Sequence, residues 1–232
     1  MDGASLLNEA ETFGLHLSRT QLEAFSVFEK RLYRANEKMN LTAVPEAECW
    51  KRHFLDCLSL SPLIPKGANV LDVGSGPGFP GAVLAIARPD LKVTCLDSSS
   101  KAVSFMQSVF GSDSPLPVLF EILHARAEEL SHNERYREQY QFVTSRATAR
   151  FAILVEICAA FAAVGGKFVP MRTPAERSQI AESQAAAFGL RLVEFQTIRI
   201  APLDADRLLP IFEKVGRTPP RLPRKWAQIK SG

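Results

Sequence analysis

Apolar residues in the first 65 positions recur at helical spacing, three or four residues apart: Leu6, Ala10, Phe13 and Leu17. Ser18 followed by Gln21 has the form of a capping box, which predicts the start of a second helix. That helix would bury Leu22, Phe25, Phe28 and Leu32. Pro45, in a favoured first-turn position, predicts a third helix running towards Leu60. Residues 1–65 are therefore expected to form an N-terminal helical extension.

From Ala68 onwards, short apolar stretches alternate with longer amphipathic ones. The pattern predicts strands over 70–73, 93–97, 118–123, 142–145 and 167–171, and helices over 80–87, 101–110, 128–136 and 151–164. Strands separated by helices of this length form βαβ units and a parallel sheet. We therefore expect an α/β core over residues 66–216, within one compact domain.

The end of this core follows a different pattern. Thr173 and Glu176 form a second capping box, which predicts a helix that stops near Gly189. Residues 191–200 and 207–215 then read as two antiparallel strands with no helix between them. Pro210 lacks a backbone donor, so we expect it at a bulge or on an edge strand.

Charge is distributed unevenly along the chain. The whole sequence has 28 basic and 25 acidic residues, but no acidic residue follows Glu213, whereas six basic residues do. Without those six, the rest of the chain has 22 basic residues against the 25 acidic ones. Residues 217–232 therefore form a basic tail, which suits a polyanionic partner and is equally compatible with a tail that only solubilises the protein.

The four cysteines form no C-x-x-C pair, and Cys95 and Cys158 lie within apolar runs. This pattern argues against a metal site and against a disulfide framework. The N-terminus lacks the basic start and apolar run of a signal peptide. The longest apolar stretch, residues 151–164, is shorter than the roughly 20 residues that cross a bilayer. We expect a soluble, cytoplasmic protein without a metal ion.

The strongest local signal is the stretch Val-Leu-Asp-Val-Gly-Ser-Gly-Pro-Gly-Phe-Pro-Gly over residues 70–81, in which an apolar strand enters a glycine-rich turn. Gly76, Gly78 and Gly81 match the dinucleotide fingerprint G-x-G-x-x-G. Asp72, two residues before Gly74, instead matches the D-x-G-x-G-x-G pattern of S-adenosylmethionine enzymes. A carboxylate there would repel a pyrophosphate and suits a cationic cofactor, so we favour adenosylmethionine. A tight turn without a ligand is the third possibility.

Asp97 ends the next expected strand, about twenty residues after the glycines. Both cofactor classes place an acidic residue there to bind ribose hydroxyls. An Asp before Ser98-Ser99-Ser100 could equally cap a helix.

Motifs spread over most of the chain resemble the bacterial 16S ribosomal RNA guanine-N7 methyltransferases of the glucose-inhibited division protein B type. They are Asn40-Leu41-Thr42, Arg52-His53-Phe54-Leu55-Asp56, the glycine stretch with Phe79-Pro80-Gly81, Ala125-Arg126-Ala127-Glu128-Glu129, Ser145-Arg146-Ala147, Glu213-Lys214 and Pro223-Arg224-Lys225. The resemblance implies a Rossmann-like methyltransferase fold with a seven-stranded, mostly parallel sheet and helices on both faces. It also implies an adenosylmethionine pocket that uses Gly74, Phe79, Ala127, Glu128 and Arg146.

The resemblance implies methyl transfer from adenosylmethionine to guanine N7 in 16S ribosomal RNA. N7 has a lone pair and no proton to lose, so an in-line displacement would need no general base and would depend on positioning. The fourth strand leads into Thr144-Ser145-Arg146 rather than the Asp-Pro-Pro-aromatic type of motif that accompanies amine methylation. We expect Arg146 to contact the cofactor or guanine O6; a surface salt bridge is its alternative role.

The remaining expectations concern the ligands. The cofactor would lie against Asp72, Gly74, Gly76, Gly78, Phe79, Asp97, Ala127, Glu128 and Arg146. RNA, in the small ribosomal subunit, would contact Arg52, His53, Arg172, Arg221, Arg224 and Lys225. His53 could instead be a hydrogen-bonded packing residue. The protein is expected to act as a monomer.

Three alternatives stay open at this point: a methyltransferase for another RNA, a protein or a small molecule; a nicotinamide-dependent oxidoreductase; and a non-catalytic RNA-binding or assembly protein.

Overall fold

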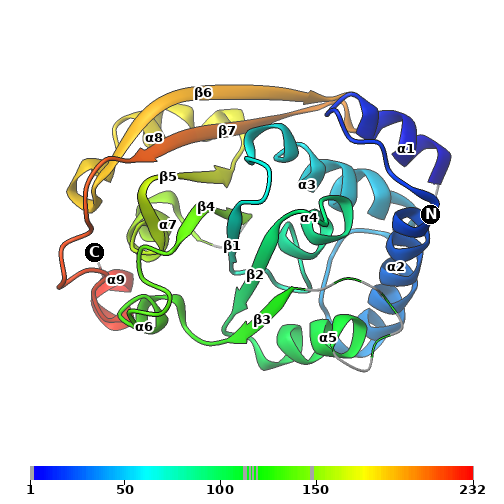
Figure 1. The fold of residues 1–232 in the computed structure, drawn as a ribbon, viewed down its shortest axis with the longest axis horizontal. Coiled ribbons are helices and arrows are strands. Elements are labelled where there is room, and N and C mark those ends of the chain that lie inside the picture. Colours follow the sequence, from blue (N-terminus) through cyan, green and yellow to red (C-terminus); the bar gives the residue numbers. More distant parts are fainter. Residues whose placement is uncertain are drawn as a thin grey trace.

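A seven-stranded sheet forms the centre of the protein, with strand order β3-β2-β1-β4-β5-β7-β6 (Figure 1). The computed structural model describes residues 3–111, 114, 116, 118, 120–146 and 149–231. The strands are β1 (Asn69–Val73), β2 (Lys92–Asp97), β3 (Glu121–His124), β4 (Tyr140–Arg146), β5 (Ala162–Met171), β6 (Leu190–Ile200) and β7 (Ala205–Lys214). β1 to β5 pair in parallel, and β7 is antiparallel to both β5 and β6. The prediction of a mostly parallel sheet is confirmed.

Helices cover both faces of this sheet. One side carries α1 (Gly3–Glu11), α2 (Arg19–Met39), α3 (Asp56–Leu58), α4 (Gly81–Ala87) and α5 (Ser100–Phe110), and the other carries α6 (Ala127–Leu130), α7 (Phe151–Ala159), α8 (Arg177–Ala181) and α9 (Trp226–Ser231). Successive strand residues alternate between two hydrophobic cores: Val70 packs in the core with Phe28, and Leu71 in the core with Phe151. This period-2 alternation fixes which face each strand residue contacts.

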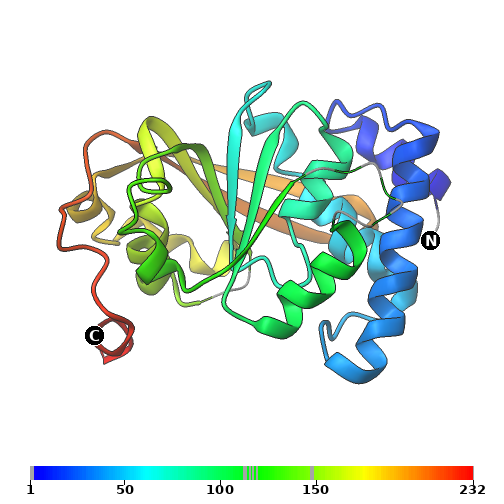
Figure 2. The ribbon, with the colours of Figure 1, turned by 60° about the horizontal axis from the view of Figure 1, so that its bottom comes forward.

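The capping box at the start of α2 also attaches this helix to the sheet domain. Ser18 Oγ accepts from the Gln21 N–H at 3.3 Å, and Gln21 Oε1 accepts from the Ser18 N–H at 2.8 Å. Gln21 Nε2 donates to the carbonyl oxygens of Ile86 and Ala87, at the end of α4. Figure 2 shows α2 as the long helix beside α5 at the N-terminal side of the molecule. The N-terminal helices therefore pack directly on the core.

Several expected elements differ from the observed ones. The helix expected from Pro45 to Leu60 is a 3₁₀ turn at Glu46–Glu48, a π-helical segment at Trp50–Leu55 and the short α3. The expected helix over 151–164 ends at Ala159, because β5 already begins at Ala162. Leu119, in the strand expected over 118–123, and Ala147, in the Ser-Arg-Ala motif, lie outside the described residues.

Pro210 lies in β7, which is an interior strand, so its expected place on an edge is wrong. β5 and β7 pair at Phe212 and again through a bridge at Leu208, and no pairing joins them at Pro210 itself. The interruption removes the need for the backbone donor that proline lacks.

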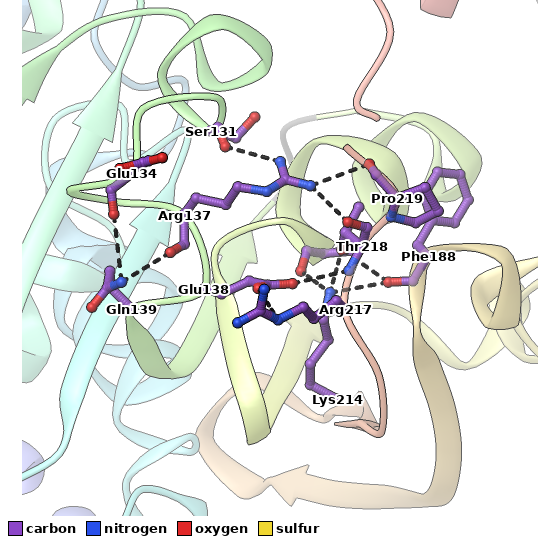
Figure 3. Close-up of polar contacts among 11 residues, drawn as sticks. Ser131, Glu134, Arg137, Glu138, Gln139, Phe188, Lys214, Arg217, Thr218 and Pro219 are labelled. Atoms are coloured by element: carbon purple, nitrogen blue, oxygen red, sulfur yellow. Dashed lines mark hydrogen bonds and ion pairs between the residues drawn. The ribbon is translucent and has the colours of Figure 1, made fainter. Parts of the chain in front are cut away.

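A guanidinium holds the C-terminal segment, residues 215–231, against the body of the protein (Figure 3). Arg137 donates to the carbonyl oxygens of Thr218, Pro219 and Leu222, and also to that of Ser131. Glu138 Oε1 accepts from the Thr218 N–H at 3.0 Å. These contacts of Arg137 and Glu138 fix the start of the segment through its backbone.

Lys214, at the end of β7, is completely buried beside the same segment. Its Nζ donates to the carbonyl oxygens of Ala159 and Phe188 at 2.7 and 3.0 Å and to Thr218 Oγ1. Burial lowers the pKa of Lys214 to about 8. Three acceptors stabilise the buried ammonium, which joins β7, α7 and the start of the C-terminal segment.

Across the described part of the chain, no helix combines the length and the apolar character needed to span a membrane.

Replacing Arg137 with Met should lower the free energy of unfolding by about 2 kcal/mol, because four carbonyl oxygens lose a charged donor. Urea denaturation measures the change. Arg135→Met is the matched control, because the Arg135 side chain is 75% exposed. Equal stability of the two variants would contradict the role given to Arg137.

Candidate functional site

Two cavities open at the carboxyl ends of the parallel strands, and both are lined by Gly74. The first, of about 440 Å³, includes Leu96, Asp97, Ala127 and Glu128; we call it the Asp97 cavity. The second, of about 540 Å³, is lined by residues of the N-terminal segment, the glycine turn, β4, β5 and β7; we call it the Arg146 cavity. They lie where β1 and β4 are neighbours, which is the switch point at which open α/β sheets bind ligands.

The glycine turn separates the two cavities. Gly74 and Gly76 have positive φ angles of 74° and 55°, which glycine adopts without strain. The Gly74 N–H donates to the Leu96 carbonyl at 2.8 Å, and the Gly76 N–H donates to Asp97 Oδ2 at 2.7 Å. Gly76 has open space where a Cβ would stand. The turn is therefore tied to the end of β2 and leaves room for a ligand next to its backbone.

Gly78, which was expected to lie against the cofactor, packs against α4. Its φ is 114°, and a Cβ there would stand 2.8 Å from the Ala82 Cβ. Gly78 lines neither cavity. It allows close packing at the start of α4, and it does not face a ligand in these two cavities.

Asp72 lies completely buried under the same turn. Its Oδ2 accepts from the Gly81 N–H at 2.8 Å, at the start of α4, while Oδ1 has no hydrogen-bond partner among the described residues. Burial raises the pKa of Asp72 to about 7 against the opposing effect of that hydrogen bond. Asp72 does not line either cavity, so its role here is to hold the glycine turn onto α4.

Asp97 holds two backbone groups in position, while the N-cap of α5 is Ser99. Oδ2 accepts from Gly76, and Oδ1 accepts from the Ser99 N–H at 2.7 Å, just before α5. The residue also lines the Asp97 cavity. Both oxygens already hold backbone groups in position, and each retains a lone pair for a ligand.

The wall of the Asp97 cavity opposite the glycine turn contains Ala127 and Glu128, as expected, together with Arg126 and Trp226. Arg126 Nε donates to Glu128 Oε1, and the Arg126 guanidinium lies 4.9 Å from the centre of the Trp226 ring. Neither Arg126 nor Trp226 was expected at a site. Arg126 stands in the Ala-Arg-Ala-Glu motif, whereas no sequence signal indicates Trp226.

Arg146 lies at the end of β4 with only 14% of its side chain exposed. It donates to Asp56 Oδ2 at 3.2 Å, to the Arg52 carbonyl at 3.1 Å and to His53 Nδ1 at 2.9 Å. Asp56 also accepts from Arg207 Nε and Nη2 at 2.7 and 2.9 Å. The salt bridge considered for Arg146 is therefore present, but it is buried in the wall of the cavity and not on the outer surface.

His53 is stacked on Phe79, with ring centres 4.1 Å apart and an angle of 10° between the planes. Because a guanidinium can only donate, His53 Nδ1 accepts from Arg146, and Nε2–H donates to Thr42 Oγ1 at 2.7 Å. Burial and the Arg146 charge lower the pKa of His53 to about 3. His53 is thus a neutral packing residue that also lines the Arg146 cavity.

The structure separates the expected RNA-binding cations into two groups. Arg221 and Lys225 are exposed, and 53% of the Arg52 side chain is exposed, although its Nη1 donates to Glu48 Oε2 at 2.9 Å. Arg172 is only 7% exposed and lies in the wall of the Arg146 cavity. Its Nη2 donates to the Ala149 carbonyl at 2.7 Å. Arg224 binds both carboxylate oxygens of the buried Glu156. Both guanidiniums are bound by groups of the protein itself, and 45% of the Arg224 side chain remains exposed.

The depressed pKa of His53 predicts a loss of stability in acid. His53 takes up a proton near pH 6.5 in the unfolded chain and only near pH 3 in the folded chain. The contribution of neutral His53 to the free energy of unfolding is therefore complete above pH 6.5 and is lost as the pH falls. Between pH 7 and 5, the wild type should lose about 2 kcal/mol more unfolding free energy than His53→Gln. His16→Gln is the control, since the His16 side chain is 86% exposed. Parallel pH profiles for the wild type and His53→Gln would show that His53 titrates normally.

Solved structures share this fold. A predicted O-methyltransferase, protein Atu636 from Agrobacterium tumefaciens, matches with a TM-score of 0.53 and 20% identity over 66% of this chain and 76% of that one. A TehB-like SAM-dependent methyltransferase from Corynebacterium glutamicum matches with a TM-score of 0.50 and 15% identity over 80% and 98%. At these identities the likeness establishes a Rossmann-like methyltransferase fold.

Sequence comparisons go further. The family described as rRNA small subunit methyltransferase G matches residues 21–201. Ribosomal RNA small subunit methyltransferase G of Lysinibacillus sphaericus (strain C3-41) is 38% identical over 217 residues, which cover 91% of this chain and 90% of the relative. The protein of the same name from Alkaliphilus metalliredigens (strain QYMF) is 37% identical over 231 residues, covering 97% and 96%. The chain belongs to the rRNA small subunit methyltransferase G family.

Proposed function

We propose that this protein transfers a methyl group from S-adenosylmethionine to N7 of a guanine in the 16S RNA of the small ribosomal subunit. Membership of the rRNA small subunit methyltransferase G family carries this conclusion. The two adjoining cavities support it, because methyl transfer needs a donor and an acceptor side by side, and Gly74 borders both.

The residues of the Asp97 cavity fit the nucleoside part of adenosylmethionine. Asp97 and Glu128 supply carboxylate acceptors for hydroxyl or amino groups, and Leu96 and Ala127 supply apolar surface. Gly74 borders this cavity at the glycine turn, and the open space beside Gly76 lies on the side of the Arg146 cavity. Asp72, which was expected to bind the cofactor, lies buried under the turn outside both cavities and acts on this site by holding Gly81. The cofactor, when bound, supplies an activated methyl group on a sulfonium.

The Arg146 cavity is suited to hold the guanine. The chemistry at N7 needs no base, since this nitrogen has no proton to lose, and His53 is held neutral with both ring nitrogens hydrogen-bonded. Arg146 is fixed by Asp56 and His53, so a preorganised cation faces the cavity. We assign Arg146 the task of orienting the base, and catalysis is then mainly positioning for an in-line displacement.

RNA binding is assigned to the exposed cations Arg52, Arg221 and Lys225. Lys225 directly precedes Trp226, which lines the Asp97 cavity. An RNA phosphate bound by Lys225 would therefore lie close to this cavity. Action as a monomer is part of this proposal. A ribosomal substrate supports a cytoplasmic location.

The direct test is incubation with labelled adenosylmethionine and small ribosomal subunits that lack the modification, followed by nucleoside analysis. Label in 7-methylguanosine is the expected result. Label in another nucleoside would overturn the assignment to N7, and the absence of label in RNA would overturn the substrate class.

RNA affinity should depend on salt through the tail cations. Replacing both Arg221 and Lys225 with Gln should reduce the slope of log affinity against log salt by about 1.5, since each phosphate contact contributes about 0.7 to 0.9. The control is the double variant Lys66→Gln and Lys92→Gln, which removes the same charge from exposed positions at the amino ends of β1 and β2. Filter binding over a salt series gives the slopes, and equal slopes for both variants would exclude the tail from RNA binding.

A further inference from the structure

Trp226 is an exposed aromatic residue at a cavity that already contains polar acceptors. Trp226 is the first residue of α9 and is 37% exposed. Tryptophan is on average highly buried in proteins, so this exposure is unusual. Trp226 lines the Asp97 cavity together with Asp97 and Glu128. Exposed aromatic surface beside a cavity is typical of ligand sites, where a ring provides a large and rigid contact.

The position of Trp226 is fixed from both directions along the chain. Before it, the Pro223 carbonyl lies 2.9 Å from His132 Nε2, and the Arg224 N–H donates to Glu156 at 2.8 Å. After it, Ile229 is buried in the core that contains Phe151. Three separate interactions on residues 223–229 therefore hold the indole at the cavity, and the tail as a whole is fixed by Arg137.

A second contact orients the ring itself. The Arg126 guanidinium lies 4.9 Å from the indole centre, and Arg126 also donates to Glu128. Glu128, Arg126 and Trp226 thus form one connected wall. The cation–π contact and the ion pair couple the orientation of the indole to that of the carboxylate.

We propose that Trp226 is a binding residue for the adenosine part of the methyl donor, so that the C-terminal segment completes the cofactor site. This inference rests on the proposed function, because it assigns the donor to the Asp97 cavity. A purine is a flat aromatic ring with hydrogen-bonding edges, and it needs both an apolar ring contact and nearby acceptors. Trp226 provides the first, while Asp97 and Glu128 provide the second.

The C-terminal segment would contact both ligands. Lys225, which is assigned to RNA, and Trp226, assigned to the cofactor, are adjacent. A phosphate bound by Lys225 would therefore lie next to the residue that contacts the cofactor. The C-terminal segment becomes part of both binding sites.

The test measures binding of S-adenosylhomocysteine, the product form of the cofactor, by calorimetry to the full chain. The variants are Trp226→Ala and Trp226→Phe, and the control is Trp50→Phe at the chain's other tryptophan, which lines neither cavity. Trp226→Ala should raise Kd on the order of tenfold, as loss of a ring stacked on a base does. Trp226→Phe should stay within about threefold of the wild type, since a ring is kept. Trp50→Phe should bind as the wild type.

The fluorescence emission of each single-tryptophan variant, followed during titration with S-adenosylhomocysteine, reports directly on the tryptophan that remains. Trp50→Phe leaves Trp226 as the only tryptophan, and its emission should change during titration with the same midpoint as the calorimetry. Trp226→Phe leaves only Trp50, whose emission should not respond.

Two results together would overturn this inference and leave the proposed function intact. They are wild-type affinity in Trp226→Ala and an emission of Trp226 in the Trp50→Phe variant that does not change on titration. Absence of binding to the wild-type protein would overturn both the inference and the proposed function.

Discussion

The arrangement of the site depends on one buried carboxylate. Asp56 is 1% exposed and accepts hydrogen bonds from Arg146 of β4 and Arg207 of β7. Burying a charged carboxylate is costly unless it is paired, and here two guanidiniums supply that pairing. The same contacts join the N-terminal segment to two strands of the sheet. Arg146, fixed in this way, reaches His53, and His53 stacks on Phe79 of the glycine turn.

The second constraint lies at the other end of the chain. Arg137 and Lys214 fix the start of the C-terminal segment through backbone and hydroxyl contacts, and Glu156 binds Arg224 further along. The segment consequently reaches the Asp97 cavity, where it places Trp226. The N-terminal segment thus lines one cavity and the C-terminal segment lines the other, while the glycine turn between them belongs to the sheet domain.

Local patterns predicted the order of strands and helices in the core, with errors over residues 45–60 and at the end of α7, but not these connections. The capping box of Ser18 and the alternation of apolar strands depend on near neighbours, so the fold class could be predicted and is confirmed. The bond between Asp56 and Arg207 joins residues 151 positions apart, and no sequence period reports such a pairing. The burial of Arg172 and the approach of Trp226 to a cavity likewise follow from tertiary packing. The assigned ligand contacts remain predictions.

The most direct test of this account is a double-mutant cycle between Asp56→Asn and Arg146→Ala, scored by the rate of 7-methylguanosine formation. If Asp56 acts by holding Arg146, each single variant should lower kcat by about a hundredfold, as loss of one preorganised donor does. The double variant should then be no slower than the Arg146→Ala single variant, because both changes remove the same interaction. Wild-type turnover in Asp56→Asn, or multiplication of the two effects, would contradict the claim that this buried pair organises the site.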